Sequence, residues 1–112
     1  MKRIICFLRP HRLEAVKTAI AELGITGLTV NDVRGCGTSP EPQVALGGQT
    51  HVVALPIRSR LSTVVPDDLV EPIIEAIIAV AQTGMSGDGK IFVEPIEDSI
   101  RIRTEERGLA GL

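Results

Sequence analysis

Residues 84–93 read Gly-Met-Ser-Gly-Asp-Gly-Lys-Ile-Phe-Val and connect a helical pattern before them to a strand pattern after them. Three glycines let backbone N–H groups approach an anion, and Lys90 adds a positive charge. The spacing from Gly84 to Lys90 matches the first seven positions of a P-loop, but Ile91 stands where a P-loop has Ser or Thr. The context is also reversed, because a P-loop follows a strand and opens a helix. The stretch therefore predicts a phosphate-binding loop that holds a nucleotide rather than hydrolysing it.

Two stretches of the chain carry the apolar periodicity of a helix that is buried on one side. Residues 69–81, just before the glycine-rich loop, have a wide apolar stripe, and Asp67 or Asp68 can cap its start. An earlier stripe recurs at spacings i, i+3, i+7 and i+10, and Gly24 suits the position after its last turn. This stripe consists of Leu13, Val16, Ile20 and Leu23.

Strand patterns alternate with these helices. They are expected at 4–8, at about 28–34, at about 52–65 and at 91–93. Pro56 breaks the third of them. The sequence Ile-Arg-Ile-Arg at 100–103 alternates cleanly and predicts a further short strand with both arginines on one face. Residues from about 36 to 50 are rich in Thr, Ser, Pro, Gln and Gly, and a loop of this length is usually functional or disordered.

The order of these elements predicts the fold class. Strand, helix, strand, long loop, strand, helix, strand makes two βαβ halves of similar length within one domain, residues 1–112. This order predicts an α/β (α+β) sandwich of the ferredoxin-like type, with an antiparallel sheet and both helices on one face. The other face of such a sheet needs cover, so we expect an oligomer that packs sheet against sheet.

Composition limits the classes of partner. Hydrophobic residues make up 44% of the 112 residues, which suits a packed core and excludes general disorder. The net charge of −2 gives no basic field for nucleic acid or a membrane, and only Phe7 and Phe92 are aromatic, too few for stacking on bases. The first apolar run is too short to enter a membrane. Two cysteines without CxxC spacing indicate a reducing cytoplasm.

Three cations form the main candidate for an anion-binding group. Lys90 offers a point charge, and Arg101 and Arg103 offer planar forks of donors that suit phosphate oxygens. The alternative is a solvated strand face on which the arginines pair with nearby acidic residues. The glycine-rich loop lies only ten residues upstream, and this proximity favours the anion site. Asp88 is interpreted as a turn-holding residue rather than a catalytic base.

The remaining polar residues predict neither catalysis nor a metal site. Arg58 and Arg60 share one strand face and could form a second cationic spot, although an exposed strand edge is the better account. Cys36 and His51 could be imagined as a metal pair, but structural zinc needs four ligands. No Ser-His-Asp or Cys-His grouping and no carboxylate pair can be argued from the spacing, so we expect no enzyme.

Residues 83–93 strongly resemble the C-terminal signature of the nitrogen-regulatory P-II signal-transduction family. Further matches lie in the same register and cover nearly the whole chain, except for the loop from 36 to 55 and the last few residues. They are Arg9-Pro10 with Leu13, and the segments 24–30, 33–35, 64–68 and 100–104.

The resemblance implies a homotrimer of ferredoxin-like subunits in which ATP and ADP compete for the clefts between neighbours. Its phosphate-binding loop is residues 83–90, and its C-terminal loop and tail are residues 98–112. By resemblance, the phosphates meet Gly87, Asp88, Gly89, Lys90, Arg101 and Arg103. The adenosine end meets Leu28, Thr29, Gly35 and Val64. Gly37 and Thr38 approach the phosphates from the base of the long loop.

The long loop, residues 36–55, corresponds to the flexible T-loop by which the family docks onto its targets, and here the sequence departs from the family pattern. His51 replaces the tyrosine that is uridylylated or adenylylated, and Gln49 replaces a serine phosphorylated in some members. Ser39 replaces a glutamine that helps to hold Mg²⁺ and 2-oxoglutarate, and Arg58 replaces a lysine. Two more replacements are Thr38 for arginine and Cys36 for an aromatic residue.

These departures shape the predicted function. The resemblance implies a cytoplasmic signalling protein that binds ATP and ADP, with Mg²⁺ as an optional co-ligand. It would regulate a target protein, a membrane transporter or a regulatory enzyme, in nitrogen control. Because Ser39 and Arg58 are the candidate effector-binding residues and both are altered, we expect a weak or absent 2-oxoglutarate response and no uridylylation. The alternatives are control of bicarbonate or heavy-metal transport, and a slow ATPase.

Overall fold

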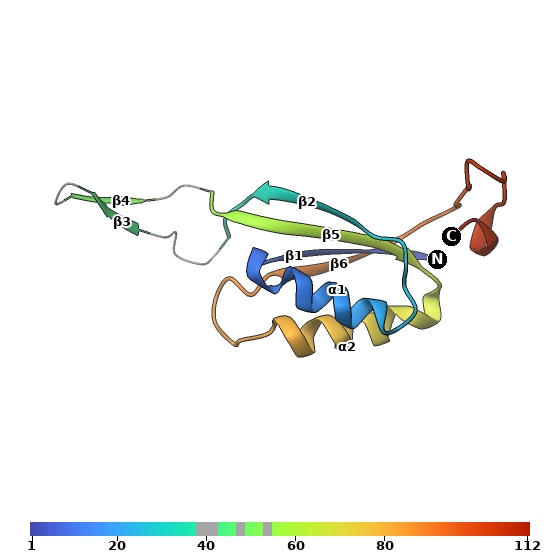
Figure 1. Ribbon diagram of the computed structural model, residues 1–112, viewed down its shortest axis with the longest axis horizontal. Coiled ribbons are helices and arrows are strands. Elements are labelled where there is room, and N and C mark those ends of the chain that lie inside the picture. Colours follow the sequence, from blue (N-terminus) through green and yellow to red (C-terminus); the bar gives the residue numbers. More distant parts are fainter. Residues whose placement is uncertain (38–42, 47–48, 53–54) are drawn as a thin grey trace.

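A computed structural model of the chain describes residues 1–37, 43–46, 49–52 and 55–112 (Figure 1). The described residues include the α-helices α1 (Leu13–Ala21) and α2 (Val70–Ala81). The strands are β1 (Lys2–Leu8), β2 (Thr29–Arg34), β3 (Gln43–Leu46), β4 (Gln49–Val52), β5 (Ile57–Val65) and β6 (Lys90–Pro95). Short 3₁₀ turns occupy Pro10–Arg12, Asp67–Leu69 and Gly108–Gly111. No helix in the described ranges is long and apolar enough to cross a membrane.

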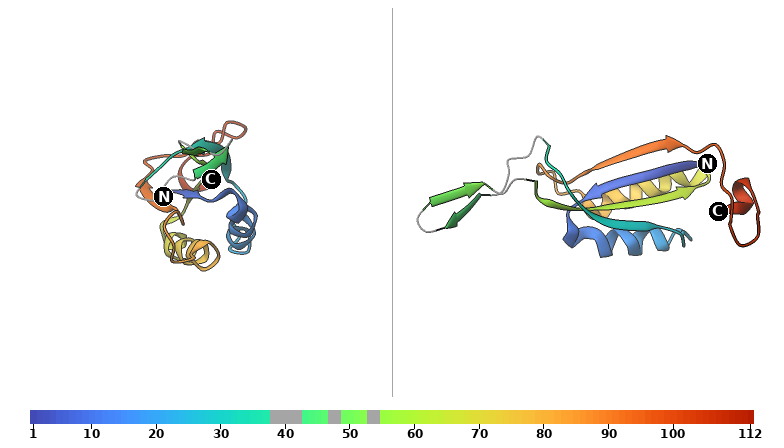
Figure 2. Two further views of the ribbon diagram at one scale, coloured as in Figure 1. Left: turned by 90° about the vertical axis from the view of Figure 1, so that its left-hand side faces the viewer. Right: turned by 90° about the horizontal axis from the view of Figure 1, so that it is seen from above.

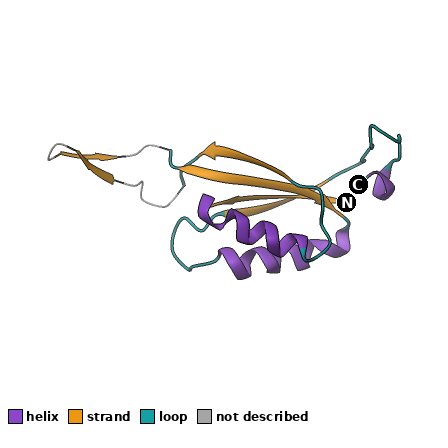
Figure 3. Cartoon of the chain, viewed as in Figure 1, coloured by secondary structure: helices purple, strands orange, loops and turns teal. Residues whose placement is uncertain are grey.

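The main sheet has the strand order β2-β5-β1-β6, and all of its neighbouring strands are antiparallel. β1 lies in the middle and pairs with β5 on one side and with β6 on the other. α1 connects β1 to β2, and α2 connects β5 to β6, so each half of the chain is a βαβ unit. Both helices lie on the same face of the sheet (Figures 2 and 3). The predicted ferredoxin-like arrangement is confirmed.

The core lies between the sheet and the two helices. Alternation along β1 turns Ile4, Cys6 and Leu8 toward the helices, where each is almost completely buried. The helices meet them with the predicted stripes, which bury Val16 and Ile20 from α1 and Ile73 and Ile77 from α2. The Cys6 thiol shares this apolar layer, and its burial raises its pKa to about 11.

The opposite face of the sheet is open in the described part of the chain (Figure 2). The side chains that alternate with the core residues of β1 are Arg3, Ile5 and Phe7, and the register places Phe92 of β6 opposite Ile5. The rings of Phe7 and Phe92 meet edge to face, with centroids 6.2 Å apart. Phe92 remains 49% exposed. This face is therefore partly apolar and has no helix over it.

The strand predicted at 100–103 was wrong. Residues 102–104 form a turn, and Ile100 makes only an isolated bridge with Arg107. The chain reverses here because the N–H of Arg101 donates to the carbonyl of Glu106 over 2.9 Å, and Glu105 takes a positive φ of 61°. The two arginines therefore do not share a strand face.

The strand predicted at about 52–65, with a break at Pro56, is confirmed from Ile57 onward but does not include Val52. β5 begins at Ile57, and Val52 instead ends β4, opposite Gln43 of β3. β3 and β4 pair with each other as a two-stranded sheet apart from the main one, so the long loop contains a hairpin that the composition did not predict.

Candidate functional site

Residues 83–89, with Lys90 at the start of β6, form the glycine loop between α2 and the sheet. Gly84, Gly87 and Gly89 have φ values of 84°, 95° and 115°, in the left-handed region that side chains rarely adopt. Gly89 also lies directly against the end of β1. A Cβ atom at Gly89 would fall 1.9 Å from the carbonyl oxygen of Phe7. The glycines are therefore required by conformation and, at Gly89, by close approach to the sheet.

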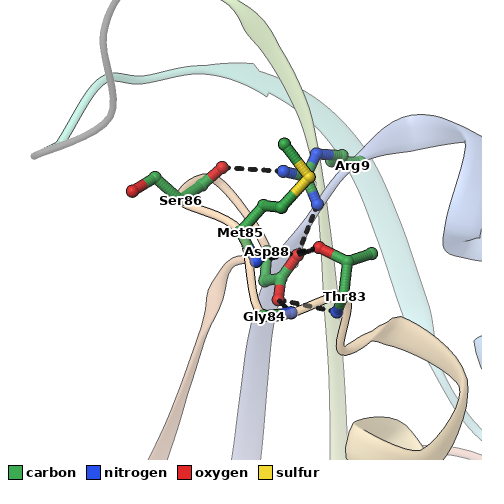
Figure 4. Close-up of polar contacts among 6 residues, drawn as sticks. All are labelled: Arg9, Thr83, Gly84, Met85, Ser86 and Asp88. Atoms are coloured by element: carbon green, nitrogen blue, oxygen red, sulfur yellow. Dashed lines mark hydrogen bonds and ion pairs between the residues drawn. The ribbon is translucent and has the colours of Figure 1, made fainter.

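Asp88 lies at the centre of this loop and accepts several hydrogen bonds from it (Figure 4). The Oδ2 atom accepts from the backbone N–H of Thr83 over 2.8 Å and from that of Gly84 over 2.9 Å. The Thr83 hydroxyl donates to Oδ1. These donors, with Thr83 first, hold the pKa of Asp88 well below its usual range. The turn-holding interpretation of Asp88 is confirmed.

Arg9 reaches the loop from the end of β1. Its Nη1 atom lies 2.6 Å from Oδ1 of Asp88, and its Nη2 atom donates to the carbonyl oxygen of Ser86 over 2.8 Å. Both charged side chains are mostly buried, at 22% and 23% exposed. We call Arg9, Thr83 and Asp88 the loop clamp. Sequence reasoning missed Arg9 because 79 positions separate it from Asp88 and no local pattern relates the two.

The three predicted anion-binding cations do not come together within one chain. Lys90 is exposed at the start of β6, beside the loop, whereas β6 carries the chain to the other end of the sheet before Arg101 and Arg103 (Figure 1). The Arg101 guanidinium donates to the carbonyl oxygen of Leu112, and its Nη1 lies 3.8 Å from Oε1 of Glu106. Closeness in sequence was misleading here because an extended strand separates its two ends by about 3.3 Å per residue.

The other predicted nucleotide-binding residues also lie at different positions along the sheet. Gly35 and Gly37 follow β2 at the end of the sheet that carries the glycine loop, and the N–H of Gly35 donates to the carbonyl of Pro56 over 3.1 Å. Leu28 and Thr29 lie near mid-sheet, where Thr29 is opposite Ser62. Val64 is farther toward the end that carries Arg101. Thr38 and Ser39 lie outside the described residues.

Strand register adds an observation that the sequence alone did not supply. Phe7 is opposite both Arg60 and Lys90, and Arg3 is opposite Val64. Because directly opposite residues share a face, Lys90 and Val64 lie on the open face of the sheet. The same register places Thr29 and Arg58 there. Predicted residues from three strands therefore gather on the face that no helix covers.

A concavity lies on the helix side of the loop. It measures about 400 Å³ and runs between α2 and β6, with Asp88, Gly89 and Lys90 at its border. Its walls are mainly apolar and include Ile74 and Val93. Such walls do not suit phosphate groups. No cluster of three or more metal-ligating side chains occurs among the residues that the structure describes.

Comparison with known proteins agrees with this arrangement. A family model described as Nitrogen regulatory protein P-II matches residues 1–106. Nitrogen regulatory protein P-II of Haemophilus influenzae is 43% identical over 106 residues, which is 95% of each chain. The protein of the same name from Bradyrhizobium diazoefficiens is 43% identical, and Nitrogen regulatory protein P-II 1 of Escherichia coli K12 is 41% identical, both over the full length of each chain. The chain therefore belongs to the nitrogen regulatory P-II family of signal-transduction proteins, and it is a regulator rather than an enzyme.

Proposed function

We propose that the chain binds ATP and ADP competitively in clefts between copies of itself. The bound nucleotide then controls a target protein in nitrogen regulation through residues 36–55. One observation carries the proposal: the glycine loop and Lys90 lie at one end of the sheet, and Arg101 and Arg103 lie at the other. β6 alone spans six residues, so about 20 Å separate the two groups. A site that uses both groups needs two chains.

The chemistry of the loop suits the phosphate end of a nucleotide. The positive φ values of Gly87 and Gly89 allow the backbone to present N–H groups without side chains in the way. No hydrogen bond among the described residues engages the N–H of Gly87, so this donor is available. Lys90 lies exposed beside it. Two guanidinium groups from a neighbouring copy would add planar donors to the same phosphates.

The open face of the sheet supports assembly. Phe7 and Phe92 present apolar surface there, and Phe92 is half exposed. Packing three such faces together would bury this surface and bring the end of one chain toward the glycine loop of the next. A homotrimer with three nucleotide sites is therefore the assembly we propose.

The long loop sets the regulatory properties in this proposal. His51 cannot be uridylylated as a tyrosine can, and Ser39 lacks the amide that the family uses toward Mg²⁺ and 2-oxoglutarate. Nucleotide exchange would act by favouring different loop conformations, and the loop would dock on a membrane transporter or a regulatory enzyme in the cytoplasm. The relatives compared are nitrogen regulators, so control of bicarbonate or heavy-metal transport is not favoured.

Mixed oligomers test the composite site. Lys90→Ala and the double variant Arg101→Ala/Arg103→Ala are each expected to weaken ATP and ADP binding at least tenfold in calorimetry, because each removes charge-assisted hydrogen bonds. Co-assembly of the two variants should restore one intact site in each mixed trimer, since only one of its clefts combines an unaltered loop with unaltered arginines. Mixed trimers that bind no better than either parent would refute the shared cleft. A wild-type chain that binds neither nucleotide would refute the function itself.

The effector prediction has its own measurement. Calorimetric titration of ATP with and without 2-oxoglutarate and Mg²⁺ is expected to give affinities that agree within about threefold, roughly 0.6 kcal/mol. A strong increase in ATP affinity with 2-oxoglutarate would contradict the argument from Ser39 and Arg58.

A further inference from the structure

The guanidinium group of Arg9 holds the glycine loop at two points. Its Nη1 donates to Oδ1 of Asp88 over 2.6 Å, and its Nη2 donates to the carbonyl oxygen of Ser86 over 2.8 Å (Figure 4). Gly87 lies between these two points and has a φ of 95°. A planar fork of donors can fix two acceptors at once, which a single ammonium group does less well. The Arg9 side chain, which directly follows β1, therefore fixes the backbone on both sides of Gly87.

Asp88 completes the same unit from inside the loop. Its carboxylate gathers the N–H groups of Thr83 and Gly84 together with the Thr83 hydroxyl, and so it holds the turn that leads out of α2. The hydroxyl is fixed further because it accepts from the N–H of Met85 over 3.2 Å. The ion pair between Arg9 and Asp88 therefore links the start of the loop, at Thr83 and Gly84, to its middle, at Ser86.

The ion pair also has an electrostatic consequence. A bare carboxylate next to a phosphate-binding backbone would repel the ligand, and at 23% exposure the Asp88 charge is only partly screened by water. Arg9 balances that charge at contact distance. Without Arg9, the loop would lose its contacts at Ser86 and Asp88 and would carry an unbalanced negative charge.

We propose that Arg9 is a positioning residue for anion binding, acting through Asp88 and the Ser86 carbonyl to hold the loop backbone ready for phosphate groups. This inference rests on the proposed nucleotide function. Arg9 shapes and neutralises the loop and does not itself contact the ligand. In the same way, the role of Asp88, which resemblance placed among the nucleotide-binding residues, is to organise the loop from within.

A set of variants separates this role from a direct contact. Arg9→Gln is expected to weaken ATP binding about tenfold, and Arg9→Lys less, because lysine keeps the charge but not the fork. Asp88→Asn should cost less ATP affinity in the Arg9→Gln background than in the wild type, since the ion pair with Arg9 is already absent there. A direct contact from Arg9 to the phosphates predicts instead that the two losses add. Additive losses would overturn the proposal.

Amide hydrogen exchange supplies a readout that does not depend on the ligand. Without nucleotide, Arg9→Gln should speed exchange at residues 84–89 and leave the amides of β1 and β5 unchanged. Lys90→Ala is the matched control, because it should weaken nucleotide binding and leave exchange in the loop unchanged. If wild-type protein binds no nucleotide but Arg9→Gln still loosens the loop, the nucleotide function fails and the clamp stands. If wild-type protein binds ATP and Arg9→Gln alters neither affinity nor loop exchange, the clamp fails alone.

Discussion

Gly89 illustrates how a single residue can be required for two reasons. Its φ of 115° disfavours any side chain, and a Cβ atom there would meet the Phe7 carbonyl oxygen at 1.9 Å. Gly84 shares only the first property, because its φ is 84° and a Cβ atom would have nothing within 4 Å. Comparing the two positions therefore distinguishes the cost of an unfavourable φ from the cost of a steric clash within one loop.

Alanine substitutions at these two glycines should differ in cost. Gly84→Ala is expected to lower the free energy of unfolding by about 1 kcal/mol, from the unfavourable φ alone. Gly89→Ala should lower it by about 3 kcal/mol, because the loop must also move away from β1. Urea denaturation followed by circular dichroism measures both. Equal losses would mean that the contact with Phe7 can relax without cost.

The Asp88 carboxyl group should titrate at unusually low pH. Its folded-state pKa is lowered, first by the donors of Thr83 and then by Arg9, so its contribution to stability is present above the unfolded pKa of about 3.9. That contribution is lost only as the pH falls through the lower folded value. NMR of the carboxyl carbon measures the midpoint. Thr83→Val should raise the midpoint toward the ordinary range, and an unchanged midpoint would show that Thr83 is not the main cause.

The two thiols should react at very different rates. Burial raises the pKa of Cys6 to about 11, whereas Cys36 is exposed. At pH 8 a thiol reagent should therefore modify one cysteine quickly and the other only on unfolding. Cys36→Ser is the control, and it should abolish the fast phase. Because the folded pKa of Cys6 is raised, its neutral form stabilises the fold below about pH 9, and this stability declines as the pH rises toward 11.

At the scale of the elements, α2 shows which substitutions should destabilise the core. Ile73 is completely buried against the sheet, whereas Ile78 on the same helix is 43% exposed. Ile73→Ala should lower the free energy of unfolding by about 3 kcal/mol, and Ile78→Ala by less than about 1 kcal/mol. Denaturant titration of the two variants gives this comparison. Similar losses would mean that Ile78 is buried in the assembled protein.

The sequence predicted the elements whose signal is local and missed those that depend on distant partners. The stripes of α1 and α2 and the apolar run of β1 each lie within one short stretch of sequence, and all three elements were found. The alternation at 100–103 carries the same local signal as a strand, but strand formation also requires a neighbour to pair with. In the structure that segment turns back on Glu106 instead. The β3–β4 hairpin was missed because its residues show composition typical of a loop.

The candidate site was predictable to a similar degree. The glycine loop and Lys90 are contiguous, so spacing revealed them. Arg9 joins the loop from the other end of the chain, and only the folded structure brings it there. The separation of Arg101 from Lys90 likewise depends on the course of β6 along the sheet.

For the whole molecule, the open face of the sheet makes the proposed assembly testable. Phe92→Glu places a charge on that face, beside Phe7, and is expected to dissociate the oligomer because an unpaired carboxylate is costly to bury. Ile78→Glu adds the same charge on the helix side at a similar exposure and should leave the oligomer intact. Sedimentation velocity measures the mass, and circular dichroism verifies folding. A folded Phe92→Glu protein that still sediments as a trimer would place the interface elsewhere.

The length of β6 has a consequence for concentration. If each chain contributes its loop to one cleft and its arginines to another, a single dissociated chain possesses two half-sites and no complete one. Mass action then links ligand occupancy to protein abundance. Dilution of the protein below the dissociation constant of the assembly should abolish ATP binding. ATP should in turn lower the protein concentration at which the subunits separate. A cell that made too little of this regulator would therefore have fewer copies of it, and those copies would also no longer respond to adenine nucleotides.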